Sequence, residues 1–450
     1  MVATELPRIV VAAPASGHGK TTVATGLMAA LAARGLSVSG HKVGPDFIDP
    51  GYHALATGRP GRNLDPFLVG EHRVVPLLLH GARSADVAVL EGVMGLFDGR
   101  LGTAGEASTA HVAALTASPV LLVVDISHAS RTHAAMIAGL ATFDPSVRIA
   151  GVILNKAGSA RHADEVRDAL GPTGIPVLGV LPRDDRVEVP SRHLGLVPAA
   201  ERADSARTLE RMTEMVAAHV DIDALLCLAR SAGALHEAPW DPTQDIRPPT
   251  EARPVVAMAG GRAFTFRYGE TEELLRAAGC DVVEFDPLVD ATLPAGTAGI
   301  YLGGGFPEVH ATELAQNRCM MAEVESAITA GVPTVAECAG LLYLCRSLDD
   351  TPMVGAVPAD AAMTPRLTLG YRTATSPADS VLTEKGITVT GHEFHRTAIT
   401  SSQSRPAWQL PAGPEGFATP TLHAAYLHTH WAGHPALARR FAQAVHGLSA

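Results

Sequence analysis

Short apolar runs alternate with longer helical patterns along the first half of the chain. Helical patterns at residues 22–33 and 161–170 are long enough to connect neighbouring parallel strands. This alternation predicts an α/β domain with a mostly parallel sheet over residues 1–230. The apolar runs, each expected to form a buried strand, are 9–13, 38–42, 87–90, 120–125, 149–154 and 177–181.

The alternation stops at residues 231–254, where proline and polar residues replace it. The stretch 240–249, W-D-P-T-Q-D-I-R-P-P, is unsuited to a helix or a central strand, so we expect a linker. A second α/β series predicts a second domain over residues 255–450. Its expected strands are 255–258, 282–285, 299–302, 332–336 and 424–427.

Composition limits the classes of partner. The 450 residues are 47% hydrophobic and 18% charged, which is enough for two buried cores in a globular protein. A formal net charge of -11 without a polybasic patch argues against nucleic acid and against a membrane surface. Five scattered cysteines without paired spacing, and no apolar signal core near the N-terminus, predict a cytoplasmic protein.

The first predicted strand leads through a glycine-containing loop into a helix. Residues 12–22, A-A-P-A-S-G-H-G-K-T-T, have the order of a phosphate-binding loop, although Pro14 stands where the first glycine is usual. We expect the Lys20 ammonium to contact the β- and γ-phosphates of ATP and the Thr21 hydroxyl to bind Mg²⁺. The predicted ATP-binding residues of this loop are Ser16, Gly17, Gly19, Lys20, Thr21 and Thr22.

Charged residues follow two further strands of this sheet. Lys42 ends one strand and is followed by two aspartates, whereas Glu91 ends another and precedes a third. Open parallel sheets bind ligands at the carboxyl ends of their strands, so we expect Lys42 to contact ATP. Each acid alone could equally be a turn residue or a helix cap. The predicted metal ligands are Thr21, Asp46 and Glu91, and the predicted substrate or second-metal residues are Asp49 and Asp98.

Two positions leave alternatives open. Asn155 ends another strand, where its carboxamide could contact the purine of ATP, but a turn role fits equally well. Partitioning and division ATPases carry an additional lysine where this chain has Ala15. The missing lysine argues against a nucleotide-switched partitioning protein.

In the second domain, an apolar run enters the segment A-E-C-A-G-L-L at residues 336–342. Small residues after Cys338 suit a sharp strand-to-helix turn that exposes a nucleophile, and the following helix N-terminus should favour its thiolate. An isolated cysteine is more often a buried structural residue. The flanking pattern makes a catalytic role the better hypothesis here.

Two other segments could complete this site. The segment G-G-G-F-P-E at residues 303–308 ends a predicted strand with three glycines. The backbone N–H groups of Gly304, Gly305 and Ala339 are therefore predicted to form an oxyanion hole. His428 and His430 follow the last predicted strand and are both candidate bases for Cys338. The histidine-rich G-H-E-F-H at 391–395 is a candidate substrate or interdomain contact.

Taken in order, these motifs resemble those of the cobyrinic or hydrogenobyrinic acid a,c-diamide synthases over nearly the whole chain. The motifs are S-G-x-G-K-T-T, K-V-G-P-D-F-I-D-P, L-E-G-V-M-G-L-F-D-G, L-N-K, G-G-G-F-P-E, A-E-C-A-G-L and G-H-E-F-H. The resemblance implies a P-loop domain similar to dethiobiotin synthetase, followed by a class I glutamine amidotransferase domain. Ala339 and Phe306 stand where the family commonly has glycine and tyrosine.

The resemblance also implies residue roles. Cys338 would be the glutaminase nucleophile, and His428 best matches the family's base, with His430 kept as an alternative. Thr429-His430 stand where Pro-Glu follows the histidine in other class I members, so a Cys-His dyad is expected.

The implied reaction amidates the a and c acetate carboxylates of a corrinoid. ATP and glutamine would be co-substrates with Mg²⁺ as cofactor, and ammonia from glutamine would attack an acyl phosphate. Cobyric acid synthase and nickel-sirohydrochlorin a,c-diamide synthase are related alternatives. The choice between hydrogenobyrinic and cobyrinic acid stays open, as does the oligomeric state, for which a homodimer is one option.

Overall fold

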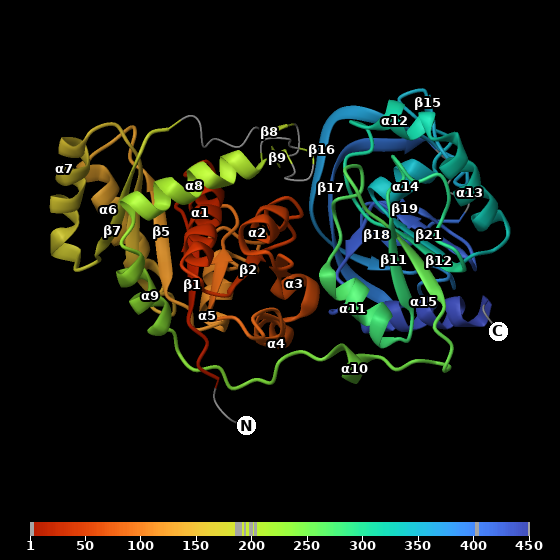
Figure 1. Cartoon of the computed structure of the whole chain (residues 1–450), viewed down its shortest axis with the longest axis horizontal. Helices are drawn as coiled ribbons and strands as arrows, with labels where there is room; N and C mark the ends of the chain where they lie inside the picture. Colours follow the sequence, from red (N-terminus) through yellow and green to blue (C-terminus); the bar gives the residue numbers. More distant parts are fainter. Residues whose placement is uncertain are drawn as a thin grey trace. The chain divides into compact units, whose positions relative to one another are not determined.

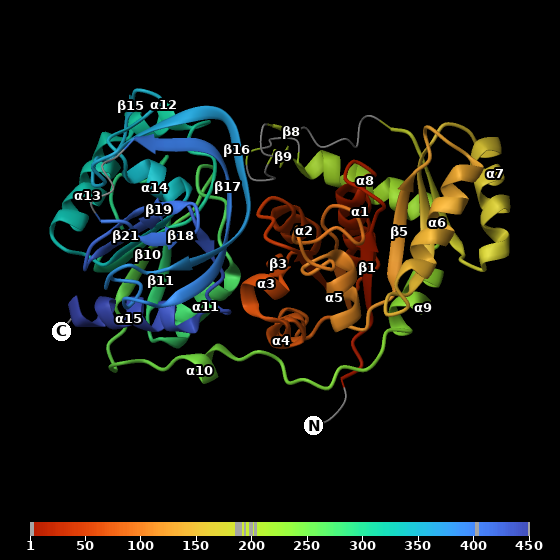
Figure 2. The ribbon, with the colours of Figure 1, turned by 180° about the vertical axis from the view of Figure 1, so that it is seen from behind.

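In the computed structural model, the chain forms two compact units, Met1–Trp240 and Asp241–Ala450. The structure describes residues 4–184, 191–192, 195–197, 201, 205–400 and 405–448. The division between the units falls inside the segment 231–254, which also contains the short helix α10 (Pro242–Asp245). Figures 1 and 2 show the elements of both units from opposite sides.

A seven-stranded sheet forms the centre of the first unit, and its strands pair in parallel throughout. The order is β3-β2-β4-β1-β5-β6-β7, which places the phosphate-loop strand β1 between β4 and β5. Its strands are β1 (Arg8–Ala12), β2 (Val38–Val43), β3 (Arg62–Leu64), β4 (Val87–Glu91), β5 (Val120–Asp125), β6 (Ile149–Ala157) and β7 (Val177–Pro182), and β8 (Ser191–Arg192) pairs separately with β9 (Gly195–Leu196).

Helices of the first unit pack on this sheet and on one another. α1 contacts α8 in front of the sheet in Figure 1, and residues such as Val11, Leu27 and Met212 share one buried core there. The sequence of α1 is apolar on nearly every side, as expected for a helix that is buried over most of its surface. The helices are α1 (Lys20–Ala33), α2 (Asp49–Thr57), α3 (Pro66–Val69), α4 (Glu71–Gly81), α5 (Thr109–Leu115), α6 (Arg131–Phe143), α7 (Ala160–Leu170), α8 (Ser205–His219), α9 (Ile222–Arg230) and the 3₁₀ helix η1 (Gly171–Thr173).

The second unit has a six-stranded sheet of order β11-β10-β12-β13-β21-β20. β20 is antiparallel to β21, and the other neighbours are parallel. Helix α15 packs on β12 so closely that a Cβ at Gly299 would lie 2.5 Å from Val445 Cγ2. The elements are β10 (Val255–Ala259), β11 (Asp281–Phe285), β12 (Thr297–Leu302), β13 (Thr334–Glu337), β20 (Phe417–Ala418), β21 (Leu422–Ala425), α11 (Gly269–Ala277), α12 (Ala311–Gln316), α13 (Arg318–Thr329), α14 (Ala339–Leu344) and α15 (Pro435–Leu448).

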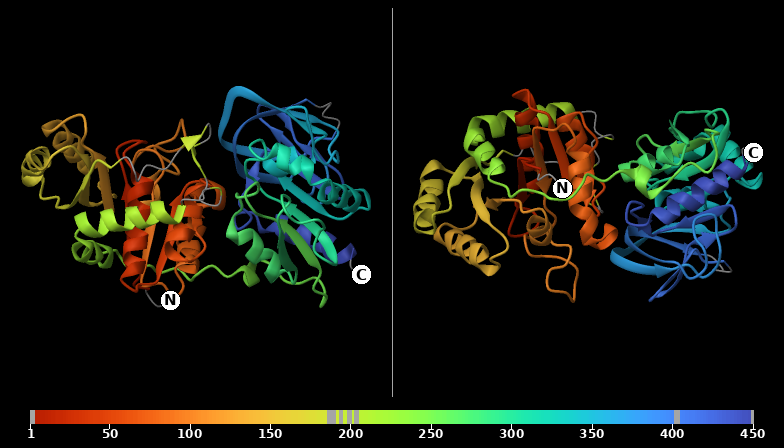
Figure 3. Two further views of the ribbon diagram at one scale, coloured as in Figure 1. Left: turned by 45° about the horizontal axis from the view of Figure 1, so that its top comes forward. Right: turned by 90° about the horizontal axis from the view of Figure 1, so that it is seen from below.

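A second sheet of this unit is built around two long antiparallel strands, β16 (Asp360–Thr375) and β17 (Thr388–Thr400), which curve strongly in the views of Figure 3. These strands were not predicted from the sequence, because β16 contains Pro365 and Gly370 and shows no regular alternation of buried and exposed side chains. The other strands are β14 (Ser347–Leu348), β15 (Thr351–Pro352), β18 (Trp408–Leu410), β19 (Gly413–Glu415) and β22 (His428–Thr429).

The predicted fold class is confirmed: both units are α/β, and the first is built on a parallel sheet. The predicted strand at 424–427 was placed too late, since β21 ends at Ala425 and His428 begins the separate strand β22. The small edge strand β3 was missed because it has only three residues. Among the described residues, no helix is long and apolar enough to cross a membrane.

Candidate active sites

The loop after β1 has the backbone that a phosphate-binding loop requires. Gly17 and Gly19 have left-handed φ angles of 86° and 89°, and α1 begins at Lys20. A Cβ at Gly19 would lie 2.3 Å from Asn155 Nδ2, so the loop and Asn155 fit only with glycine there. Asn155 Nδ2 donates to the His18 carbonyl at 2.9 Å. Asn155 therefore supports the loop, and contact with a purine stays a prediction.

Lys20 is folded back over this loop. Its Nζ donates to the carbonyls of Ala15, at 3.3 Å, and Met94. Burial and then the nearby Lys42 ammonium lower the pKa of Lys20 to about 8. A phosphate placed in the loop would supply the negative charge that this buried ammonium needs.

Lys42 lies at the centre of a buried charge cluster at the ends of β2 and β4. Its Nζ is 2.7 Å from Asp49 Oδ2 and 3.2 Å from Glu91 Oε1. Burial disfavours the charged form of Lys42, but these two carboxylates outweigh it and raise its pKa. Thr21 Oγ1 donates to Glu91 Oε1 at 2.6 Å, which brings the predicted metal ligands Thr21 and Glu91 together.

His53 was not predicted from the sequence, yet it belongs to this cluster. It is fully buried on α2, and its Nε2 lies 2.7 Å from Glu91 Oε2. Burial opposes ionisation of Glu91, but Lys42 and the His53 hydrogen bond lower the pKa of this carboxyl. One histidine among 20 carries no pattern that would have singled it out.

The remaining acids have local hydrogen bonds. Asp46 Oδ1 accepts from the N–H groups of Ile48 and Asp49, at 2.8 and 3.1 Å, as a turn-forming residue does. Asp98 Oδ2 accepts from the Gly95 N–H at 3.0 Å. Burial, then the carboxylates of Asp46 and Glu91, raise the pKa of Asp49. The carboxylates of Asp46, Asp49 and Glu91 thus repel one another, and a cation bound among them would relieve this repulsion.

In the second unit, Cys338 stands between β13 and α14 with φ 50° and ψ −96°. A left-handed φ in a residue other than glycine is strained, and it suits the turn predicted for an exposed nucleophile. The turn packs on the neighbouring loop, since the Gly340 N–H donates to the Gly303 carbonyl at 3.0 Å. A Cβ at Gly340 would lie 2.4 Å from the Leu302 carbonyl oxygen.

The expectation that a helix N-terminus makes Cys338 a thiolate needs correction. Burial, followed by the charge of Glu308, raises the pKa of the thiol, and the Ala339 N–H that points at the sulfur only partly opposes this. Helix α14 has six residues, so its dipole is small. The thiol therefore needs a base.

His428 lies close to the end of β13, which precedes Cys338, and to the glycine loop at residues 303–305. Its Nδ1 is 3.8 Å from Oε2 of Glu337, the residue before Cys338. On its other side, a Cβ at Gly304 would lie 2.5 Å from His428 Cε1 and 3.3 Å from Nε2. The imidazole thus fits between Glu337 and the loop because position 304 is glycine.

His430 lies elsewhere. It is fully buried, its ring stacks on Tyr268 with centroids 4.1 Å apart, and its Nε2 is 3.7 Å from Glu270 Oε2 at the start of α11. Of the two histidines predicted as bases, the geometry favours His428.

The predicted oxyanion hole changes in one member. The Gly304 N–H donates to the Phe266 carbonyl at 2.8 Å, so it is already used in this conformation. Within the described residues, the Gly305 N–H has no hydrogen-bond partner, and a Cβ there would lie 1.9 Å from the Ala263 oxygen. We therefore keep Gly305 and Ala339 as the predicted donors and leave out Gly304.

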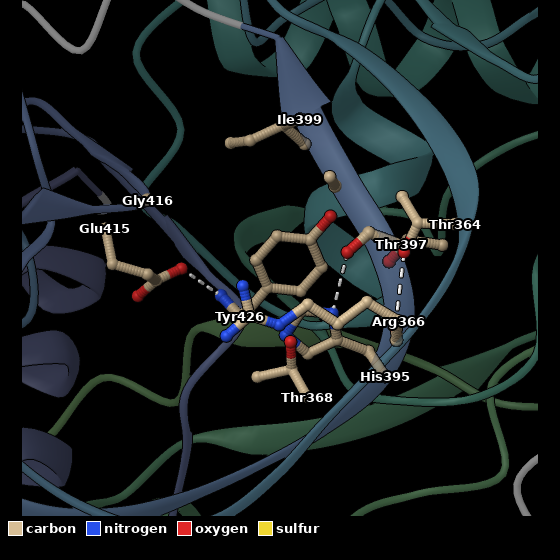
Figure 4. A pocket seen from close by; sticks show the side chains of 10 residues that line it. Thr364, Arg366, Thr368, His395, Thr397, Ile399, Glu415, Gly416 and Tyr426 are labelled. Atoms are coloured by element: carbon tan, nitrogen blue, oxygen red, sulfur yellow. Dashed lines mark hydrogen bonds between the residues drawn. The ribbon is translucent and has the colours of Figure 1, made fainter. Parts of the chain in front are cut away.

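A cavity of about 340 Å³ is lined by residues of the long strands β16 and β17, by Glu415 at the end of β19 with Gly416 after it, and by Tyr426. Figure 4 shows the Tyr426 ring among the residues that line it, with Glu415 on one side and Thr397 on the other. His395 of the G-H-E-F-H motif stacks on Tyr426 with centroids 3.8 Å apart. The Cys338 N–H donates to the Ala425 carbonyl at 2.7 Å. Tyr426 directly follows Ala425, so this side of the cavity is one residue from the strand that accepts this hydrogen bond.

Two family models match the chain. Residues 9–197 match the CobQ/CobB/MinD/ParA nucleotide binding domain, and residues 255–436 match the CobB/CobQ-like glutamine amidotransferase domain. With the loop at Lys20 and the turn at Cys338, these matches define the class: a nucleotide-binding unit joined to a glutamine amidotransferase unit.

Full-length relatives narrow the class. The chain is 60% identical to the hydrogenobyrinate a,c-diamide synthase of Thermobifida fusca, with 98% of each chain covered. It is 54% identical to the enzyme of that name from Streptomyces coelicolor, with 97% of each covered. It is 44% identical to the cobyrinate a,c-diamide synthase of a Synechococcus species, covering 98% of this chain and 99% of the other. The chain belongs to the a,c-diamide synthase family.

Gly304→Ala tests whether the loop makes room for the base. The added Cβ would displace His428, so glutamine hydrolysis should fall at least about tenfold, whereas synthesis with ammonium should remain. Gly447→Ala, where nothing lies within 4 Å of the new Cβ, is the matched control. Unchanged glutamine turnover in Gly304→Ala would show that His428 does not need this space.

Glu415→Gln tests a buried acid of the second unit. Burial raises the pKa of Glu415 to about 8, although Tyr426 N–H donates to it. An acid whose pKa is higher in the folded state destabilises the fold as pH rises from its unfolded value through the folded one. Between pH 6 and 9, the free energy of unfolding of the wild type should therefore fall by roughly 3 kcal/mol more than that of the variant.

Denaturant titrations at the two pH values measure this difference. Exposed Glu325 on α13 gives the control variant Glu325→Gln, which should follow the wild type. Parallel pH curves for wild type and Glu415→Gln would mean that Glu415 is ionised in the folded protein at pH 6.

Proposed function

We propose that this protein uses ATP and glutamine to amidate the a and c acetate carboxylates of hydrogenobyrinic acid. The observation that carries the proposal is one chain with two sites. One is a phosphate loop with buried Lys20 and Lys42. The other is a strained Cys338, whose preceding residue Glu337 lies 3.8 Å from Nδ1 of His428. Relatives named for hydrogenobyrinate share 60% and 54% identity with this chain, whereas relatives named for cobyrinate share 44%, 39% and 40%, which supports the cobalt-free substrate.

In the glutaminase half, His428 would take the proton of the Cys338 thiol as sulfur attacks the glutamine carboxamide. The N–H groups of Gly305 and Ala339 would stabilise the oxyanion of the tetrahedral intermediate. The proton on His428 would pass to the leaving ammonia, and water would then hydrolyse the thioester to glutamate. The raised pKa of the buried thiol explains why a base is needed.

In the synthetase half, a substrate carboxylate would attack the γ-phosphorus of ATP and release ADP. Lys20 and Lys42 would balance the charge on the transferred phosphoryl group, and the loop N–H groups would hold the phosphates. Ammonia would then attack the acyl phosphate, forming the amide and releasing phosphate.

The residues around Thr21 fit Mg²⁺. The described residues contain no group of three His, Cys, Asp or Glu side chains placed to hold a metal, but Mg²⁺ on ATP needs few protein ligands besides phosphates and water. Thr21 Oγ1 and Glu91 Oε1, which lie 2.6 Å apart, would hold the ion. Asp49 Oδ2 lies 3.4 Å from the same Thr21 hydroxyl. When bound, Mg²⁺ would neutralise phosphate charge.

The proposal also includes a cellular location. All five cysteines are free, which supports a reducing, cytoplasmic location. The second-metal or substrate role of Asp98, the contact of Asp46 with Mg²⁺ and a homodimer stay predictions.

Cys338→Ala tests the division of labour between the units. The variant should lose synthesis driven by glutamine but retain synthesis driven by ammonium, because the acyl phosphate forms in the other unit. Product mass after incubation with hydrogenobyrinic or cobyrinic acid reports the number of amides and the preferred substrate. Equal loss with both nitrogen donors would contradict the proposal.

Glu91→Gln makes the reciprocal test. Removing this carboxylate should abolish synthesis from both donors by at least about 10²-fold, whereas glutamine hydrolysis should continue. Exposed Glu71→Gln is the control in the same unit. Full synthetase activity in Glu91→Gln would exclude Glu91 from the site.

A further inference from the structure

Glu337 ends β13 directly before Cys338, and its side chain is buried at the centre of a set of donors. Oε1 accepts from the Thr429 hydroxyl at 2.9 Å and from the Thr429 N–H at 3.3 Å. Oε2 accepts from the Tyr301 hydroxyl at 3.0 Å and lies 3.8 Å from His428 Nδ1. The carboxylate is therefore fixed from two sides and faces the imidazole.

The direction of the imidazole is fixed by the same contacts. Nδ1 faces Glu337, and the Cε1–Nε2 edge faces Gly304, since a Cβ at Gly304 would lie 2.5 Å and 3.3 Å from these atoms. An acceptor at Nδ1 favours the tautomer that carries its proton there. Nε2, on the side of the glycine loop, is then left with the lone pair that can take a proton from Cys338.

We propose that Glu337 is the acidic positioning residue of this glutaminase, in place of the acid missing two positions after His428. The proposal rests on the glutaminase function proposed above. Glu337 would orient the ring, select the Nδ1–H tautomer and stabilise the imidazolium that forms when His428 takes the thiol proton. The 3.8 Å distance is longer than a hydrogen bond, as is common before substrate binds.

The strand pairing explains how an acid directly before Cys338 can lie next to His428. β13 and β21 pair in parallel with Glu337 opposite Ala425, so the chain that continues from β21 to His428 passes the end of β13. β22 then pairs with β17, with His428 opposite His392. The base is thereby held between Glu337 of β13 and the strand that carries His392.

Among the described residues, the charged or titratable groups packed around His428 include Glu337 on β13, His392 on β17, Tyr301 on β12 and Cys338. Arg372 acts on His392, and Glu308 acts on Cys338. Burial, then Glu337, raise the pKa of Tyr301, which keeps its hydroxyl a donor. Burial and then His428 lower the pKa of His392, so Glu337 is the anion among these groups that faces the base.

The experiment measures glutamine hydrolysis and ammonium-driven synthesis in the full-length wild type, Glu337→Gln and Glu337→Asp, over pH 5 to 9. Glu337→Gln should lower kcat for glutamine roughly 10²-fold with little change in KM, and leave ammonium-driven synthesis unchanged. Because a nearby carboxylate raises the pKa of a histidine, its loss should also move the acidic limb of the pH profile to lower pH. Glu337→Asp should restore the limb and part of the rate.

Tyr301→Phe and Thr429→Val separate positioning from structural support. Each removes a donor to Glu337 but leaves the carboxylate facing His428, so their acidic limbs should match the wild type. The proposal is overturned if the acidic limb in Tyr301→Phe and Thr429→Val shifts as far as it does in Glu337→Gln. It is also overturned if Glu337→Gln keeps the acidic limb of the wild type and a kcat for glutamine within twofold of the wild type. If Glu337→Gln does not fold, an unshifted limb in a folded, weakly active Glu337→Asp overturns it. Absence of glutamine turnover in the wild type would instead refute the proposed function.

Discussion

The strained backbone at Cys338 is the constraint on which the second site depends. A φ of 50° reverses the chain between β13 and α14 within one residue, which leaves the sulfur at the carboxyl end of the sheet. The strain persists because Gly340 lies against Leu302 and donates to Gly303, so the turn and the glycine loop fix each other. The proposed nucleophile and the proposed oxyanion donors are thus positioned by one packing contact.

The two units solve the problem of buried charge in opposite ways. The first buries the Lys42 ammonium against the carboxylates of Asp49 and Glu91. Hydrogen bonds with His53 and Thr21 occupy the two oxygens of the Glu91 carboxylate. Such a cluster is held together only if its partners remain, because an unpaired buried charge costs several kcal/mol. The second buries the Cys338 thiol, whose pKa is raised by burial, and in the proposed mechanism its charge forms only during the reaction, when a base and backbone donors are present.

Much of this could be predicted from the sequence, because short apolar strands followed by G-K-T or E-C-A-G carry strong local signals. Lys20 and Cys338 were found because they belong to these two segments, and Lys42 and Glu91 because each lies at or next to the end of an apolar strand. His53 and Glu337 were missed as site residues because their roles arise from α2 packing on β2 and from the parallel pairing of β13 with β21. The occupied N–H of Gly304 also depends on a distant partner, Phe266.

The choice between His428 and His430 illustrates the same limit. Two residues apart on one short segment, both histidines are buried, and composition treats them alike. What separates them is that one ring faces Glu337 and Gly304, whereas the other stacks on Tyr268 near Glu270. A base must reach the nucleophile and hold the correct tautomer, and only tertiary neighbours provide both. Because Glu337, the residue before the proposed nucleophile, lies 3.8 Å from the proposed base His428, the local turn and the remote histidine form one structure.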